Sequence, residues 1–71
     1  MNEWMILRQM KFDACTVTLY RSMWAMNKWK GETKYNTGET ASIELENEKE
    51  AWRGFYIECR KALDKESARW D

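Results

Sequence analysis

The sequence predicts a mainly α-helical protein, in which two long helices form an antiparallel hairpin and two hairpins pair into a four-helix bundle. Three observations favour this fold class. The first thirty residues contain neither proline nor glycine, turn-forming residues gather between residues 30 and 40, and apolar residues recur every seven positions on both sides of that break. A chain of 71 residues has room for one core, so we expect a single domain over residues 1–71.

The first helix is expected over residues 3–29. Four apolar residues spaced by seven positions share one face of that helix: Met5, Phe12, Leu19 and Met26. A second apolar line lies on another side of the same helix: Ile6, Met10, Val17 and Trp24. Because one hairpin partner covers only one side, the second line predicts the interface of a homodimer.

The second helix is expected over residues 44–70, after a connection at residues 30–40 that holds Gly31, Asn36 and Gly38. Two interleaved series spaced by seven define its apolar stripe: Leu45, Trp52 and Cys59, and Tyr56, Leu63 and Trp70. Asn47 followed by Glu50 is typical of a helix start, since an asparagine side chain can accept a hydrogen bond from the backbone three residues on. Folding back at the connection also brings Lys28 and Lys30 near the acidic residues 44–48.

A small α+β domain is the rival fold. Cys15, Val17 and Leu19 alternate with polar residues, which is the pattern of a half-buried strand. Residues 33–37 and 41–45 could pair across an Asn-Thr-Gly turn. This alternative has a short sheet from residues 14–20 and 33–45 packed on the C-terminal helix.

The composition argues against several classes of function. Twelve basic and twelve acidic residues cancel, so the chain as a whole lacks the basic charge of a typical nucleic-acid binder. It contains no histidine, the usual general base and a common metal ligand, and we expect no enzyme activity, no cofactor and no metal site. Cys15 and Cys59 are expected close together as small buried apolar residues, with the question of a disulfide left open. No apolar run is long enough to span a membrane and the first residues do not form a secretory signal, so a cytoplasmic location is expected.

Aromatic residues and lysines interleave around the expected connection, which makes this segment the candidate binding surface. Aromatic rings can stack on bases while lysines contact phosphates, although the same residues could instead pack the end of a hairpin. The candidate binding residues are Trp24, Lys28, Trp29, Lys30, Lys34 and Tyr35.

These patterns together predict a small non-catalytic module for protein–protein interaction, or a regulatory accessory protein, that acts as a homodimer and binds an unidentified protein. The alternative function is nucleic-acid binding through the aromatic and basic cluster at residues 24–35.

Overall fold

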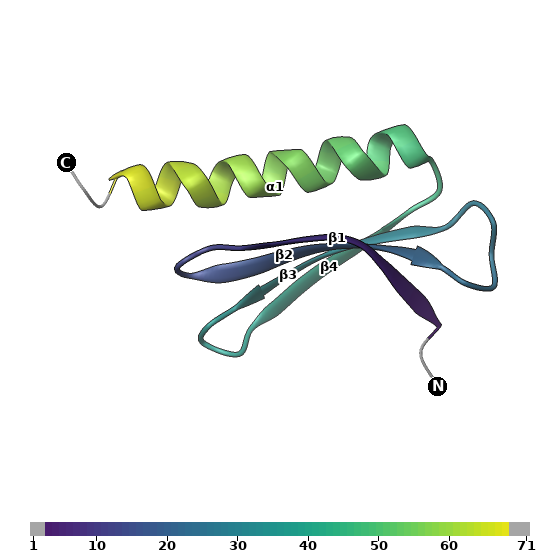
Figure 1. The fold of residues 1–71 in the computed structure, drawn as a ribbon, viewed down its shortest axis with the longest axis horizontal. Helices are drawn as coiled ribbons and strands as arrows, with labels where there is room; N and C mark the ends of the chain where they lie inside the picture. Colours follow the sequence, from purple (N-terminus) through teal and green to yellow (C-terminus); the bar gives the residue numbers. More distant parts are fainter. Residues whose placement is uncertain (1–2, 69–71) are drawn as a thin grey trace.

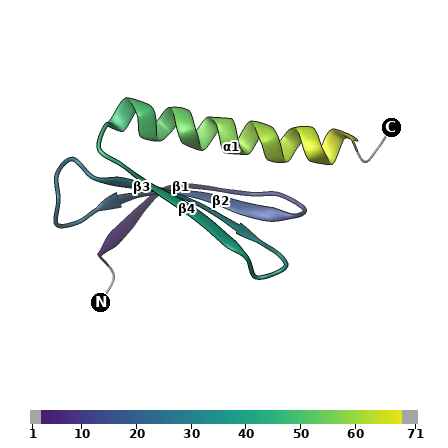
Figure 2. The same cartoon turned by 180° about the vertical axis from the view of Figure 1, so that it is seen from behind.

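The computed structural model describes residues 3–68, which form a four-stranded antiparallel sheet with one helix packed on one of its faces (Figure 1). The strands are β1 (Trp4–Lys11), β2 (Cys15–Ser22), β3 (Trp29–Tyr35) and β4 (Thr40–Leu45), and they lie side by side in chain order. The helix α1 (Glu48–Ala68) follows β4 and runs back across the sheet, as the reverse view in Figure 2 also shows.

The predicted helical hairpin, and with it the four-helix bundle, is therefore wrong. Residues 3–29 form β1, β2 and the loop after them instead of a helix, and the predicted connection at residues 30–40 contains most of β3. The spacing of seven was misleading because it does not follow one surface of the folded chain: Leu19 is fully buried, whereas Met26 lies in a loop and is 83% exposed. The rival α+β fold is closer, since its strands correspond to β2, β3 and β4, but it lacks β1.

The turn between β1 and β2 has no glycine or proline because distant residues hold it. The Phe12 amide donates to the Cys15 carbonyl at 2.8 Å and closes the turn. Asn36, after β3, donates its backbone amide to the Ala14 carbonyl and its side-chain amide to the Asp13 carbonyl. The Asp13 amide in turn donates to the Glu66 carboxylate at the far end of α1. Tertiary contacts thus satisfy backbone groups that a local turn signal would otherwise have to satisfy.

The core lies between α1 and the central strands. Val17 and Leu19 of β2 are fully buried, and they pack with Phe55 and Cys59 of α1 in one apolar cluster. Asn47 has the predicted role at the helix start, because its side chain accepts a hydrogen bond from the Glu50 amide at 3.1 Å. Glu44 and Leu45, which the prediction placed in the helix, instead belong to β4. Cys59 of the predicted stripe lies on the buried face of α1, which otherwise consists of Ala51, Phe55 and Ala62.

The predicted stripe is rotated about the helix axis relative to that buried face. Tyr56 and Leu63 are exposed and Trp52 is half-buried, so much of the stripe lies along the flank of α1. Trp70, which the spacing placed on the same stripe, lies outside the described residues.

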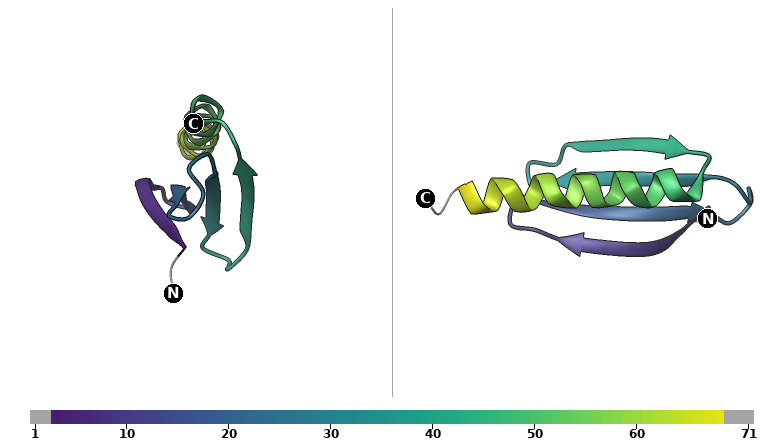
Figure 3. Two further views of the ribbon diagram at one scale, coloured as in Figure 1. Left: turned by 90° about the vertical axis from the view of Figure 1, so that its right-hand side faces the viewer. Right: turned by 90° about the horizontal axis from the view of Figure 1, so that it is seen from above.

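One helix is too narrow to cover four strands. Strands are about 4.8 Å apart, so the sheet is roughly 19 Å wide, whereas a helix with its side chains is about 10 Å across. Seen from above in Figure 3, α1 runs over the middle of the sheet and leaves β1 and β4 on either side. Within residues 3–68, no helix is long and apolar enough to cross a membrane.

Candidate functional surfaces

The first candidate surface, which we call the β1 flank, lies between α1 and β1 on the helix side of the sheet. It consists of exposed or half-buried large apolar side chains from both elements: Met5, Met10, Trp52, Tyr56 and Leu63. A shallow groove of about 300 Å³ runs through it, with Arg8 and Arg60 at its rim. The side chains at this flank are apolar because they face the core side of the sheet, yet α1 does not reach far enough to cover them.

A second apolar area, the β4 flank, lies on the other side of α1. Ile43 of β4 and Ile57 of α1 are both exposed, and they line a groove of about 320 Å³ that also includes Gly54. A third hollow of about 400 Å³ lies beneath the C-terminal half of α1, between Phe12, Tyr35 and Lys65. All three hollows follow the margins of the single helix, which shows how much of this sheet face α1 leaves uncovered.

The outer face is the face of the sheet opposite α1, and its composition is different. Residues paired across antiparallel strands share a face, so the strand register identifies its members. One row across the sheet runs Lys11, Thr16, Lys34 and Thr40. The next rows contribute Gln9, Thr18, Glu32 and Ser42, and then Ile6, Tyr20, Lys30 and Glu44. Hydroxyl, amide and charged groups therefore dominate this face.

Aromatic rings and a lysine meet at one end of the outer face. The Lys30 ammonium lies 4.8 Å from the ring centroid of Trp4 and 4.8 Å from that of Tyr20, which is within cation–π range of both. The Tyr20 hydroxyl donates to the Glu32 carboxylate at 3.1 Å. Burial, followed by the nearby Glu32 charge and hydrogen bond, raises the pKa of the Tyr20 phenol. The rings of Trp4 and Tyr20 together hold the Lys30 ammonium in place.

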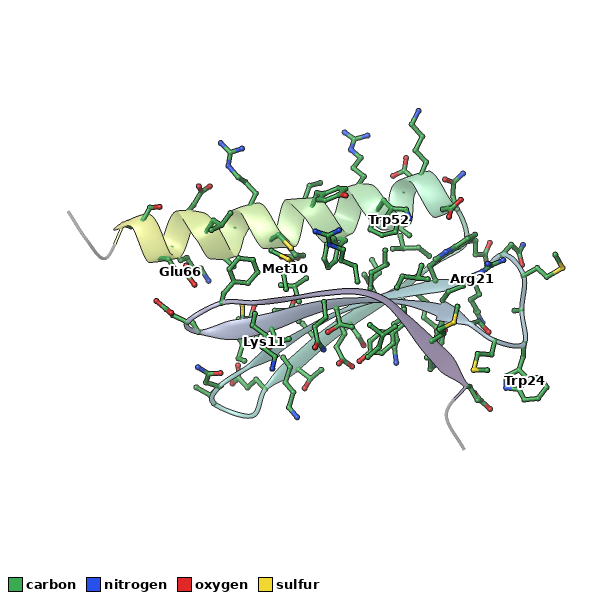
Figure 4. The ribbon with its side chains drawn as sticks, viewed as in Figure 1. Met10, Lys11, Arg21, Trp24, Trp52 and Glu66 are labelled. Atoms are coloured by element: carbon green, nitrogen blue, oxygen red, sulfur yellow. The ribbon has the colours of Figure 1, made fainter. Side chains whose placement is uncertain are left out.

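The loop at residues 23–28, between β2 and β3, carries three exposed apolar side chains: Met23, Trp24 and Met26. The Ser22 hydroxyl holds the start of this loop by accepting hydrogen bonds from the amides of Trp24 and Ala25. Trp24 is 71% exposed, and Figure 4 shows it on the side of the loop away from α1. It therefore extends the aromatic end of the outer face.

The structure divides the predicted binding cluster between both faces of the sheet. Trp29 is 7% exposed and belongs to the core, and Tyr35 packs against the same core from the helix side. Lys30 and Lys34 lie on the outer face, because alternate residues of β3 point to opposite faces. Lys28 lies next to them and pairs with Glu44 at 3.7 Å, while Trp24 lies in the adjoining loop.

The predicted dimer-interface residues do not share a surface either. Met10 belongs to the β1 flank, Ile6 lies on the outer face and Val17 is in the core. Trp24 is in the loop after β2. A change of face between Ile6 and Arg8 accompanies a β-bulge in β1, where the pairing with β2 shifts by one residue.

The two cysteines are both buried and both free thiols. Burial raises the pKa of each thiol, and the neighbouring Cys15 raises the pKa of Cys59 further. Thiols in this environment remain protonated and are poor nucleophiles. Both belong to the apolar core cluster, as expected for small buried apolar residues.

Sequence reasoning missed the most distinctive residues of both surfaces. Trp4, Lys11 and Tyr20 were not singled out because they share a face only when β1 and β2 pair. The spacing places Tyr56 and Leu63 on the same apolar stripe as Cys59, but they lie at the margin of the buried face of α1 and are exposed.

Known proteins offer no guide to either surface. No family model, no curated protein and no solved structure matches the chain. Among residues 3–68, no group of three or more histidine, cysteine or acidic residues is arranged to hold a metal ion.

Proposed function

We propose that the protein is a small non-catalytic protein-interaction module that forms a homodimer through the β1 flank. The observation that carries this proposal is the exposed apolar surface on the core side of the sheet, where Met10 of β1 lines one groove with Tyr56 and Leu63 of α1. Contiguous apolar surface of this kind is typical of sites where another protein binds. A second copy of the chain supplies an equally apolar surface, and a two-fold axis pairs like with like.

The chain exposes more surface than a folded monomer of its mass is expected to expose. A folded monomer of this mass exposes about 4,700 Å² on the usual scaling with molecular weight. The chain exposes 5614 Å². The excess of roughly 900 Å² belongs to the whole chain, including both flanks of α1, and it is large enough to contain the ~800 Å² that each partner contributes to an interface of standard size.

The charged rim of the flank suits a symmetric partner as well. Arg60 borders the groove and pairs with Asp64 one turn further along α1 at 3.5 Å, with both side chains exposed. A basic and an acidic group side by side at the rim can exchange partners across a two-fold axis. The β4 flank, with Ile43 and Ile57, remains open for a different protein.

Sedimentation equilibrium on the wild-type chain and two matched variants tests this proposal. Leu63→Gln and Ile6→Gln remove similar exposed apolar side chains, 49% and 54% exposed, from opposite faces of the sheet. We expect a wild-type mass of about twice the monomer at micromolar concentration. Leu63→Gln should raise the dissociation constant by about ten-fold or more, and Ile6→Gln should leave it unchanged.

Two outcomes contradict the proposal. The first is a wild-type protein that stays monomeric over the whole concentration range. The second is a dimer that Ile6→Gln weakens as much as Leu63→Gln does, because that result moves the interface to the outer face. Circular dichroism on both variants confirms that each retains the fold.

A further inference from the structure

We propose that the outer face of the sheet, together with the loop at residues 23–28, binds single-stranded nucleic acid. This site lies on the side of the sheet opposite the proposed dimer interface, so it goes beyond the proposed function and does not depend on it. The proposal rests on three features of this site: its uncompensated lysines, the aromatic rings at one end with the exposed Trp24 beyond them, and its shortage of apolar surface.

The charge of the outer face is positive although the chain as a whole is neutral. The register places three lysines and two glutamates on it: Lys11, Lys30 and Lys34, with Glu32 and Glu44. Glu44 pairs with Lys28, and Glu32 accepts the hydrogen bond from Tyr20. Among the described residues, Lys11, Lys30 and Lys34 have no acidic side chain within salt-bridge distance. Three lysine ammonium groups are thus left to bind an anionic partner.

The lysines are also suitably placed along the sheet. Lys30 and Lys34 lie four residues apart on β3, a separation of about 13 Å along the strand. Lys11 is in the same cross-strand row as Lys34, two strands away. Figure 4 shows the Lys11 side chain directed away from α1, on the outer side of the sheet. A negatively charged backbone laid across this face meets a lysine at each of these positions.

Aromatic side chains at the end of the face provide surfaces for stacking. Trp4 and Tyr20 enclose the Lys30 ammonium from two sides, which fixes the cation at the sheet surface beside the rings. Trp24 lies beyond them in the loop, with most of its ring exposed. Bases stack on exposed aromatic rings with little regard for sequence, and proteins that bind single strands combine such rings with a basic surface. Four-stranded sheets use an open face in this way to hold unpaired bases.

The chemistry of the face favours this occupant over a protein. Ile6 is the one aliphatic side chain among the residues that the register places here, and threonine and serine hydroxyls occupy much of the centre. A protein interface has an apolar centre, which this face lacks. Unpaired bases are required because the rings can stack only on bases that are not already stacked in a duplex.

Fluorescence anisotropy with a labelled oligothymidylate of about 15 nucleotides tests the site, a length comparable with known single-strand sites. The informative variant is Lys11→Gln with Lys34→Gln. Its matched control is Lys61→Gln with Lys65→Gln, which removes the same charge from exposed positions on α1. Titrations at about 50 and 200 mM salt measure the slope of log K against log salt.

We expect the outer-face double variant to lose about ten-fold in affinity at low salt, and its salt slope to shrink by about 0.7 for each phosphate contact removed. The control should keep both the affinity and the slope of the wild type. Trp24→Ala should lose about ten-fold without changing the slope, since it removes stacking but no charge. Met26→Ala, a change at an even more exposed position in the same loop, should bind as the wild type does.

A wild-type protein that does not bind the oligonucleotide at the lower salt concentration overturns the proposal. Equal losses in the two lysine double variants also overturn it, because they show binding through general charge alone. An unchanged affinity in Trp24→Ala contradicts the stacking role of the loop. The same samples, examined by sedimentation, separate a failure here from a failure of the homodimer, since none of these variants touches the β1 flank.

Discussion

The two faces of the sheet are built from the same strands and yet have different chemistry. On β2, Val17 and Leu19 face α1 and are fully buried, whereas Thr16 and Tyr20 alternate with them on the outer face. The helix side is apolar even where α1 does not cover it, and the outer face is polar even at its centre. Burial by α1 therefore does not by itself account for the composition of either face, and this difference is the basis on which we propose a protein partner for the first and a polyanion for the second.

The largest expected effect is a difference in stability between replacing a core residue of α1 and replacing its exposed neighbour. Phe55→Ala removes a ring that is 2% exposed and should lower the free energy of unfolding by about 3–5 kcal/mol. Tyr56→Ala, the neighbouring exposed position, should lower it by less than about 1 kcal/mol in the monomer. Urea denaturation at low protein concentration measures both. Similar losses in the two variants would show that the flank is part of the core.

The second prediction concerns the buried centre of the outer face. The Thr18 hydroxyl is buried and accepts a hydrogen bond from the Gln9 side-chain amide at 3.0 Å. Thr18→Val keeps the shape and removes that acceptor, so it should cost about 1 kcal/mol. Thr40→Val, at an exposed position of the same face, should be nearly neutral in the same denaturation experiment. A Thr18→Val variant more stable than the wild type would mean that this face tolerates apolar burial and is not selected to be polar.

The third prediction concerns two glycines whose replacement by alanine should change the stability of the protein in opposite directions. A Cβ added to Gly54 meets nothing within 4 Å, so Gly54→Ala should stabilise α1 by about 0.5–1 kcal/mol. Gly38 has a φ of +99° in the turn between β3 and β4, and Gly38→Ala should destabilise by about 1 kcal/mol despite equally open space. Thermal denaturation checks both signs. Because Gly54 lines the β4 flank, unchanged self-association in Gly54→Ala would also confirm that the homodimer does not use that flank.

The smallest effect is a dependence of stability on alkaline pH. Burial raises the pKa of Cys15 and of Cys59 above the ordinary value of 9.0, so the folded state retains protons that the unfolded chain releases. Stability should be unaffected below that value and should fall as the pH rises through it. Melting temperatures at about pH 8 and pH 10 measure the fall, and Cys15→Ala with Cys59→Ala should reduce it. An undiminished fall in the double variant would assign it to other groups, among them Tyr20, whose pKa burial also raises.

Several local features could be predicted from the sequence because neighbouring residues determine them. Asn47 starts α1 through its own side chain, and Gly38 provides the positive φ that the turn before β4 needs. The contact between Lys28 and Glu44 is also confirmed, although it joins the end of the loop before β3 to β4 and not the helices that were expected. Helix capping and turn conformation depend on a few neighbouring residues, and opposite charges attract in any antiparallel pairing. Predictions of these features can therefore be right even where the predicted type of element, helix or strand, is wrong.

The candidate surfaces could not be predicted in the same way, because each depends on pairing across the sheet. Trp4, Tyr20 and Lys30 come from three strands and meet only in this register. The predicted cluster around Trp24 and Tyr35 assumed neighbours in sequence would share a surface, but strand alternation sends Trp29 into the core and Lys30 to the outer face.

The sequence by itself determined the capping role of Asn47 at the C-terminal helix and the alternation that makes Cys15, Val17 and Leu19 a buried set. Tertiary structure alone decided that residues 4–22 form a hairpin. The turn at Asp13 and Ala14 has no glycine or proline to mark it, and it is closed by Asn36 and Glu66, which are distant in the chain. Local sequence cannot specify a turn whose hydrogen-bond partners arrive only when the strands and the helix have assembled, and the two faces of the sheet follow from that assembly.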